Sequence, residues 1–299
     1  MKHKKGDNVN GWLIIDKPKD MGSTQVVSIT RRLFNAKKNG HAGTLDPFAT
    51  GVLPIAFGEA TKLIDFVMTG TKEYEFTIRF GYETDTGDCT GAKTFSSQKL
   101  PTKEQILNIV PSFIGKIKQT PPVYSAIKVN GERAYNLARK GKNVEIKERD
   151  VEIFSLQLLD YKSESATFKT SCSKGTYIRT LGQDIARALD CYGHLTALRR
   201  TKCGIFSIDD TILLDNLKNM VYIAQALLPL ETSLRDIAVM AVSEEEASKL
   251  KQGQALSPKD RKDLPTNSSK AIAVCNKVLI AIVRIEESKI SPIRVFNLT

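Results

Sequence analysis

The first 115 residues alternate between strand-like and helix-like patterns of apolar positions. The segment GWLIID at 11–16, apolar through its centre, predicts a buried strand. Ser23 is placed to cap a helix whose Val26, Ile29 and Leu33 share one face. A short strand at 52–58 is expected to lead into a helix over about 59–68. A half-buried strand is predicted where every second residue is apolar, at Tyr74, Phe76, Ile78 and Phe80. A further helix is predicted after the capping box that Thr102 forms with Gln105.

The middle of the chain continues this mixture without a regular repeat. Residues 166–172 alternate as a strand, and a turn at 173–175 precedes a helix with apolar residues at 178, 181, 185 and 189. A further strand is expected over 194–200. The elements lack the roughly 30-residue rhythm of strand, helix and parallel strand, so we predict an α+β fold with a mixed or largely antiparallel sheet.

A change of pattern near residue 243 predicts a second, smaller unit. Ser243 and Glu246 form a capping box for a short helix, and three β-like runs follow at 271–275, 278–285 and 293–298. We therefore divide the chain into a large domain, residues 1–235, and a small β-rich module, residues 236–299. Helical residues near 215–235 are expected to connect the two.

Composition adds a strongly basic character to this picture. The 299 residues carry 44 Lys and Arg against 33 Asp and Glu, a formal net charge of +11. Residues 236–299 contribute 10 basic and 8 acidic residues, so most of the excess lies in the large domain. This balance favours a polyanionic partner such as nucleic acid, although a solubilising lysine-rich surface is the simpler alternative.

The cysteines and histidines argue against a disulfide-stabilised protein and against a metal-binding protein. The five cysteines form no C-x-x-C pair, and the three histidines are not spaced as metal ligands, so we expect reduced thiols, no metal and no cofactor. Apolar runs are shorter than the roughly 20 residues of a membrane span, and the basic N-terminus is not followed by the apolar region of a signal peptide. A cytoplasmic protein without membrane contact is the expectation.

The candidate chemistry lies in the loop-like segment 40–62, GHAGTLDPFATGVLPIAFGEATK, which holds Asp46. An Asp before Pro commonly starts a turn, and this remains an alternative. Glycines at 40, 43 and 51 would allow a constrained backbone that presents the carboxylate rigidly. One carboxylate cannot run the two-acid glycosidase scheme. It can act as a nucleophile at a sugar carbon or as a base on a sugar C–H, if the leaving nucleobase stays bound.

Five blocks of this sequence resemble the bacterial tRNA pseudouridine-55 synthases, the TruB family. They are GWLIIDKPKDMGST, HAGTLDPFATGVLPIAFGEATK, KEYEFTIRFGYETDTGD, QTPPVYSAIKVNGERAY and CSKGTYIRTLGQDIARALDCYGHLTALRRTKCGIF. The resemblance spans about residues 10–206, and the tail from about 240 resembles more loosely the family's C-terminal RNA-binding module of PUA type. It implies an isomerase that detaches the uracil of a T-loop uridine of tRNA, rotates it and rejoins it through C5.

The resemblance also implies roles for individual residues. Asp46 falls on the catalytic aspartate, Tyr74 on the tyrosine that stacks on the flipped base, Tyr177 on a second active-site tyrosine near C5, and Arg179 on the arginine that pairs with the aspartate and keeps it ionised. His41 falls on the histidine that fills the gap left by the flipped nucleotide, and Leu198 on an apolar pocket wall. Lys17 and Pro18 match a block that supports the catalytic loop. The basic cluster around Lys128 to Lys142, with Arg199, Arg200 and Lys202, is expected to grip phosphates.

Three alternatives remain beside the stand-alone, monomeric enzyme acting on the tRNA T-arm. The charge and the small module suit a tRNA-binding or tRNA-folding protein, although phosphate gripping needs none of Asp46, Tyr74, Tyr177 and Arg179. A guide-RNA-dependent relative would be expected to carry a longer N-terminal extension. Hydrolytic removal of the base would need a second acid to activate water. Whether Asp46 attacks the sugar or abstracts its C2′ proton is left open.

Overall fold

The computed structural model describes residues 6–125, 127–129, 131–141, 145–259, 261, 264 and 269–298. Within them, ten strands form one long mixed sheet in the order β14-β1-β3-β12-β4-β11-β10-β7, with β2 beside β3 and β13 beside β12. The pairs β1–β14 and β3–β12 are parallel and the other pairs are antiparallel. The predicted α+β class with a mixed, largely antiparallel sheet is confirmed. The strands of this sheet are β1 (Gly11–Lys17), β2 (Asn39–His41), β3 (Thr50–Phe57), β4 (Lys72–Phe80), β7 (Gly115–Gln119), β10 (Arg149–Lys162), β11 (Ser165–Cys172), β12 (Gly193–Cys203), β13 (Phe206–Ser207) and β14 (Ile212–Leu213).

The central strand of the sheet, β4, follows the predicted alternation. Tyr74, Phe76, Ile78 and Phe80 are buried, and the residues between them are partly exposed or exposed. Strand β4 lies between β12 and β11, so these side chains reach the main core together with residues of α5 (Ile178–Ala188). Burial of such apolar side chains from water supplies the main driving force for assembling the sheet.

Helices pack on the sheet or connect its parts. Most expected helices are present, and the Thr102–Gln105 capping box is confirmed at the start of α3. The helical elements of the large part of the chain are α1 (Ser23–Leu33), η1 (Gly58–Leu63), α2 (Ile64–Thr69), α3 (Lys103–Ile109), η2 (Val110–Phe113), α4 (Ala134–Arg139), α5, η3 (Ile208–Asp210), α6 (Leu214–Lys218), η4 (Ile223–Ala226) and η5 (Leu230–Leu234).

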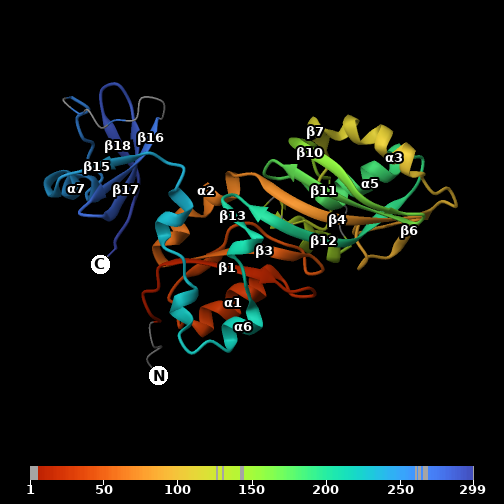
Figure 1. Ribbon diagram of the computed structural model, residues 1–299, viewed down its shortest axis with the longest axis horizontal. Coiled ribbons are helices and arrows are strands. Elements are labelled where there is room, and N and C mark those ends of the chain that lie inside the picture. Colours follow the sequence, from red (N-terminus) through yellow and green to blue (C-terminus); the bar gives the residue numbers. More distant parts are fainter. Residues whose placement is uncertain are drawn as a thin grey trace.

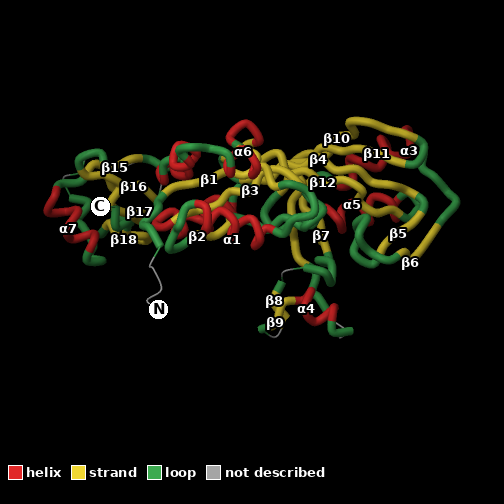
Figure 2. The backbone as a smooth tube through the Cα atoms, turned by 90° about the horizontal axis from the view of Figure 1, so that it is seen from below, coloured by secondary structure: helices red, strands yellow, loops and turns green. Residues whose placement is uncertain are grey.

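Two small hairpins extend from the main sheet. Strands β5 (Tyr82–Thr84) and β6 (Lys93–Ser96) lie at the end of the molecule opposite the C-terminal unit (Figure 2). Strands β8 (Lys128–Val129) and β9 (Glu132–Arg133), with α4, project from the body of the molecule beside β7 (Figure 2). We call residues 120–148, which join β7 to β10 and carry this projection, the projecting loop.

A separate four-stranded sheet forms within the described part of residues 236–299, in the order β15-β16-β17-β18 (Figure 1). Its elements are β15 (Val239–Ala241), α7 (Glu244–Lys251), β16 (Lys270–Cys275), β17 (Val278–Ile285) and β18 (Ile290–Val295). The Ser243–Glu246 capping box is confirmed. The last strand was expected at 293–298 but ends at Val295, because Phe296 turns into a core shared with the large sheet.

Candidate active site

Asp46 lies in the turn between β2 and β3, and three buried side chains hold the backbone of that turn. The first is Ser23, whose hydroxyl donates to the Leu45 carbonyl and accepts from the Leu45 N–H, both at 2.8 Å. The sequence predicted Ser23 as a helix cap. That prediction is wrong, because Gly22 occupies the cap position and the hydroxyl is used by the loop.

Lys17 is the second buried side chain that holds this turn. Its side chain is fully buried, and Nζ donates to the carbonyls of Pro18 at 2.8 Å, Met21 at 2.6 Å and Pro47 at 3.1 Å. Burial lowers the pKa of Lys17 to about 8, and the nearby charge of Asp46 opposes that shift. Three acceptors already occupy the three N–H groups of the ammonium, so Lys17 supports the loop and has no donor left over for a bound molecule.

Arg200 is the third anchor, which corrects its predicted role. It is 1% exposed, with Nε donating to the Val52 carbonyl at 2.8 Å and Nη2 to the Gly43 carbonyl at 2.9 Å. Gly43 and Gly51 have φ near +100°, and a Cβ at Gly51 would lie 2.1 Å from the Arg200 carbonyl oxygen. A guanidinium buried in this way cannot reach a phosphate at the surface, so the expectation that Arg200 grips phosphate is wrong.

Arg179 brings the Asp46 carboxylate and a second carboxylate together. It lies in the first turn of α5, is 3% exposed, and its Nε is 2.9 Å from Asp46 Oδ2 in an ion pair that is not aligned as a hydrogen bond. Nη2 lies 3.4 Å from Asp46 Oδ1, and Nη1 lies 3.7 Å from Asp88 Oδ2. Carbonyls of Thr86 and Tyr124 accept from the same guanidinium at 2.7 and 2.8 Å. The guanidinium therefore has one orientation, which faces Asp46.

Asp88 is a functional candidate that the sequence analysis missed. Its buried carboxylate accepts from the Thr86 hydroxyl at 2.9 Å, the Thr90 hydroxyl at 2.5 Å and the Thr90 N–H at 2.9 Å. The available signal was the segment TDTGDCT, in which threonines two residues before and after an aspartate are placed to orient it.

The environment of Asp46 favours its protonated form more than expected. Burial raises the pKa of Asp46, Arg179 and Lys17 oppose that shift, and the negative charge of Asp88 adds to it. About a third of the Asp46 side chain, 34%, stays exposed. Arg179 was expected to keep Asp46 ionised by lowering its pKa, but it only partly offsets the effect of burial.

The two tyrosines occupy different positions relative to this pair. Tyr74 is 9% exposed on β4, opposite Arg200 of β12. Burial raises the pKa of the Tyr74 phenol, so it is a neutral group. Tyr177 is half-buried at the start of α5, two residues before Arg179. Its predicted place beside the Asp46–Arg179 pair stays a prediction, and its ring lies against Arg149, whose guanidinium carbon is 4.7 Å from the ring centre.

The remaining predicted residues surround the loop unevenly. His41 ends β2 with a buried Nδ1 that has no hydrogen-bond partner, and burial lowers its pKa, as do the charges of Arg200 and Arg133. Leu198 is 7% exposed in the core below the sheet. Arg199 donates from Nη2 and Nη1 to the two carboxylate oxygens of Asp16 at 2.7 and 3.1 Å. It also lines a cavity of 270 Å³ together with Lys17 and Pro18. The side chains of Lys128 and Arg139, and the whole of Lys142, lie outside the described residues.

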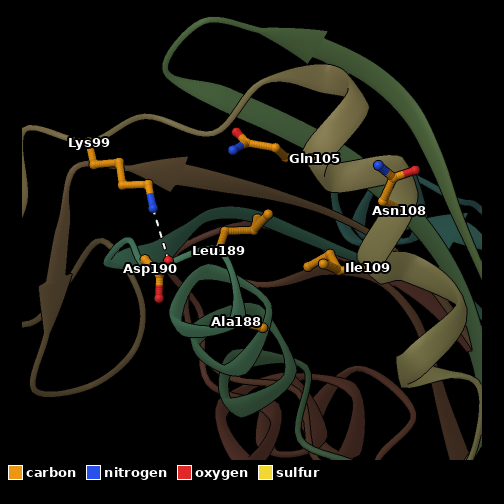
Figure 3. A pocket seen from close by; sticks show the side chains of 7 residues that line it. All are labelled: Lys99, Gln105, Asn108, Ile109, Ala188, Leu189 and Asp190. Atoms are coloured by element: carbon orange, nitrogen blue, oxygen red, sulfur yellow. Dashed lines mark hydrogen bonds and ion pairs between the residues drawn. The ribbon is translucent and has the colours of Figure 1, made fainter.

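A second cavity, of 200 Å³, lies between α3 and the far end of α5 (Figure 3). Gln105, Asn108 and Ile109 line it from α3, and residues 188–190 line it from the far end of α5. At 1.5 Å per residue, that end lies roughly 15 Å along the helix from Arg179. None of the predicted site residues borders it, so it is not the candidate active site.

The described residues contain neither a metal-binding cluster nor a membrane-spanning helix. In the described part of the chain, no group of three or more His, Cys, Asp or Glu side chains is arranged to hold a metal ion. The five cysteines are all free thiols, four of them buried. Across the same residues, no helix combines the length and apolarity that crossing a membrane requires.

Comparison of the fold gives similarity to proteins of H/ACA ribonucleoprotein particles. The structure of an H/ACA RNP bound to a substrate RNA containing 2′-deoxyuridine matches with a TM-score of 0.71 and 21% identity, over 96% of this chain and 85% of that one. An archaeal box H/ACA sRNP complex matches with a TM-score of 0.68 and 20% identity, over 96% and 86%. At such identities the similarity establishes the fold alone.

Comparison of the sequence is more specific. The N-terminal domain of the TruB family pseudouridylate synthases matches residues 31–178, and the tRNA pseudouridylate synthase B C-terminal domain matches residues 179–237. The chain is 47% identical to tRNA pseudouridine synthase B of Caulobacter vibrioides, over 100% of this chain and 99% of the relative. It is 48% identical to that of Bradyrhizobium diazoefficiens, over 98% and 87%.

These sequence matches define the chain as a pseudouridylate synthase. Within that class, the chain belongs to the TruB family.

Proposed function

We propose that this protein is a tRNA pseudouridine synthase that converts the T-loop uridine at position 55 of tRNA into pseudouridine, with Asp46 as the catalytic carboxylate. The reaction breaks the C1′–N1 bond, turns the detached uracil, and forms a C1′–C5 bond. The C5 proton is lost and N1 gains a proton, so the product is an isomer of the substrate. The observation that carries the proposal is the fixed pair of Asp46 Oδ2 and Arg179 Nε at 2.9 Å.

The geometry supports a role in which the carboxylate waits in one orientation for the sugar. Ser23, Lys17 and Arg200 hold the backbone on both sides of Asp46, and Arg179 aims its oxygens. A preorganised group of this kind loses little entropy when the substrate binds. Both roles left open for Asp46, attack at C1′ and removal of the C2′ proton, need its ionised form.

The other residues are assigned to handling the flipped nucleotide. Flipping a base out of a folded RNA loop costs a few kcal/mol, which stacking on an aromatic ring partly offsets. We assign that ring to Tyr74, the position near C5 to Tyr177, and the filling of the vacated gap to His41. Leu198 is assigned to the pocket wall. The basic cluster around Lys128 to Lys142, with Arg199 and Lys202, is assigned to the phosphates of the T-arm. The family sequence matches support these assignments.

The wider setting belongs to the same proposal. The protein acts as a cytoplasmic monomer, without metal or cofactor, and its domain boundary falls at residue 235. The small module, residues 236–299, contributes further RNA contacts. The net charge of +11 suits this role, because phosphate contacts supply most of the non-specific affinity for nucleic acid.

The test is release of tritium from a tRNA transcript labelled at uridine C5, measured with the wild type and with Asp46→Asn. Asn keeps the size of the side chain but cannot ionise, so we expect release from the wild type, none from the variant, and tRNA binding by both in a filter assay. A transcript with cytidine at position 55 is the matched control. If both proteins bind tRNA and neither releases label, the binding-protein or guide-dependent alternative replaces this proposal.

A further inference from the structure

The projecting loop is joined to the body of the protein at two facing residues, and both hold Tyr177. Gln119 ends β7 and Arg149 begins β10, and the two are direct partners across the antiparallel pair. Every residue of the projecting loop lies between them in the sequence. Together with Tyr177 they form a three-residue contact that we call the loop root.

Gln119 fixes the backbone of Tyr177. Its side-chain oxygen accepts from the Tyr177 N–H at 2.8 Å, and its amide nitrogen donates to the Tyr177 carbonyl at 3.1 Å. Gln119 is 1% exposed, so water cannot take the place of either bond. A side-chain amide can donate and accept at the same time in this paired geometry without carrying a charge.

Arg149 holds the ring of the same tyrosine. Its guanidinium carbon is 4.7 Å from the centre of the Tyr177 ring, within the range of a cation–π contact. The buried Arg149 Nε has no hydrogen-bond partner, so this edge of the guanidinium is not tied to another group. A Cβ at Gly175 would come within 3.6 Å of the guanidinium, which shows how closely the turn before Tyr177 packs against it.

The same loop also reaches Arg179. The carbonyl of Tyr124, within the projecting loop, accepts from Arg179 Nη2 at 2.8 Å, and the Thr120 carbonyl accepts from the Thr180 hydroxyl at 3.4 Å. The first turn of α5, which carries Tyr177 and Arg179, is thus fastened to the projecting loop and its root by contacts to backbone, ring and guanidinium.

From these contacts we infer that Gln119 and Arg149 are positioning residues for catalysis, which set the placement of Tyr177 and, through the first turn of α5, of Arg179. This inference rests on the proposed function. RNA that engages the projecting loop would thereby act on the geometry of the active site through the loop root. Neither residue needs to touch the reacting uridine.

The experiment measures two quantities separately for Gln119→Leu, Gln119→Glu, Arg149→Ala and Arg149→Lys. The first is the single-turnover rate of tritium release from C5-labelled tRNA at saturating enzyme, and the second is the Kd for tRNA. Gln119→Glu keeps the acceptor for the Tyr177 N–H but loses the donor to its carbonyl. Arg149→Lys keeps the charge but loses the flat guanidinium over the ring.

Because a misplacement of about 1 Å can cost roughly a hundredfold in rate, we expect the single-turnover rate to fall about 10- to 100-fold in each variant. The Kd for tRNA should stay within about twofold of wild type, because neither residue is assigned a contact with a tRNA phosphate. Relative to the wild type at the same pH, Gln119→Glu should regain rate as the pH is lowered, since a protonated carboxyl can donate to the Tyr177 carbonyl. A purely structural role would lower stability without this pH-dependent recovery of rate.

The matched control is Lys118→Ala, which removes an exposed charge one residue from Gln119 on the same strand. It should leave the saturating rate unchanged. Unchanged rates in the loop-root variants, or weaker Kd with normal saturating rates, would overturn the inference. If Gln119→Leu does not fold, the half-buried Arg149 variants decide the matter. Absence of release by the wild type would instead count against the proposed function.

Discussion

At the scale of single residues, the main feature is one arginine shared between two carboxylates. Asp46 is the more exposed of the two carboxylates. Asp88 faces Nη1 of the same guanidinium and accepts hydrogen bonds from the hydroxyls of Thr86 and Thr90. The negative charge of Asp88 raises the pKa of Asp46, while it also keeps Arg179 in place. Asp88 therefore influences both the protonation of Asp46 and the direction of its partner.

Replacing Asp88 by Asn should shift the pH dependence of the reaction. The ionised form of Asp46 is the active one, so kcat/KM falls as the pH is lowered through its raised pKa. Removing the charge of Asp88 lowers that pKa, and the acid limb of the profile should move to lower pH. The plateau should fall as well, because Arg179 loses an orienting partner.

The measurement is a pH profile of kcat/KM, with Asp85→Asn as control. Asp85 is exposed and accepts from the Ala92 N–H at 2.8 Å, away from Arg179. Its replacement should leave the acid limb in place. A limb that does not move in Asp88→Asn would show that Asp88 does not act on the titration of Asp46.

At the scale of elements, the position of the Asp46 loop depends on the start of α1. The helix has Ser23 as its first residue, and that hydroxyl makes two hydrogen bonds to the backbone of Leu45. Ser23 and Leu45 are 22 positions apart in the sequence. Their relative placement is therefore a property of how α1 packs on the sheet.

Ser23→Ala should loosen the loop with little effect on the helix. Both Leu45 groups would be left buried without a partner, which costs roughly 1–3 kcal/mol of stability for each unsatisfied group. We expect a lower free energy of unfolding in urea and a larger loss in kcat than in tRNA affinity. Ser28→Ala is the matched control, because Ser28 is exposed on the same helix and bonds only to the Thr24 carbonyl.

At the scale of the whole molecule, the small module is docked through a shared core rather than only through its connecting segment. Phe296 is fully buried in a cluster with Trp12 of β1, Leu63 of η1 and Ile282 of β17. Lys62 donates to the Val295 carbonyl at 2.9 Å, and the Asn297 N–H donates to Glu59 at 2.8 Å. These contacts fix the module against η1, the element that follows β3.

Phe296→Ala should therefore weaken the docking of the module. Loss of a buried Phe side chain costs about 3–5 kcal/mol, so unfolding in urea should begin at lower concentration and in a separate step for the module. The affinity for tRNA should fall while the saturating single-turnover rate is kept. Phe154→Ala removes a half-exposed ring and should leave both quantities unchanged.

Much of the fold was predictable because its signals are local. The alternation through Tyr74 and Phe80, the capping boxes at Thr102 and Ser243, and the irregular order of strands all depend on neighbours in the sequence. The sequence blocks also identified the family and named Asp46 and Arg179, whose pairing the structure contains. Such features are set by backbone geometry and short-range hydrogen bonds, which a linear pattern records.

Other features were decided only by the tertiary structure. Ser23 resembles a helix cap and Arg200 resembles a phosphate contact, since the sequence does not show that each ends beside the Asp46 loop. Asp88 and Arg179 are 91 positions apart, and their contact exists because α5 packs beside the turn after β5. The partner of a long polar side chain is chosen by the packing of distant segments. The sequence alone therefore determined which groups are present and in which elements, and the packing decided which of them meet.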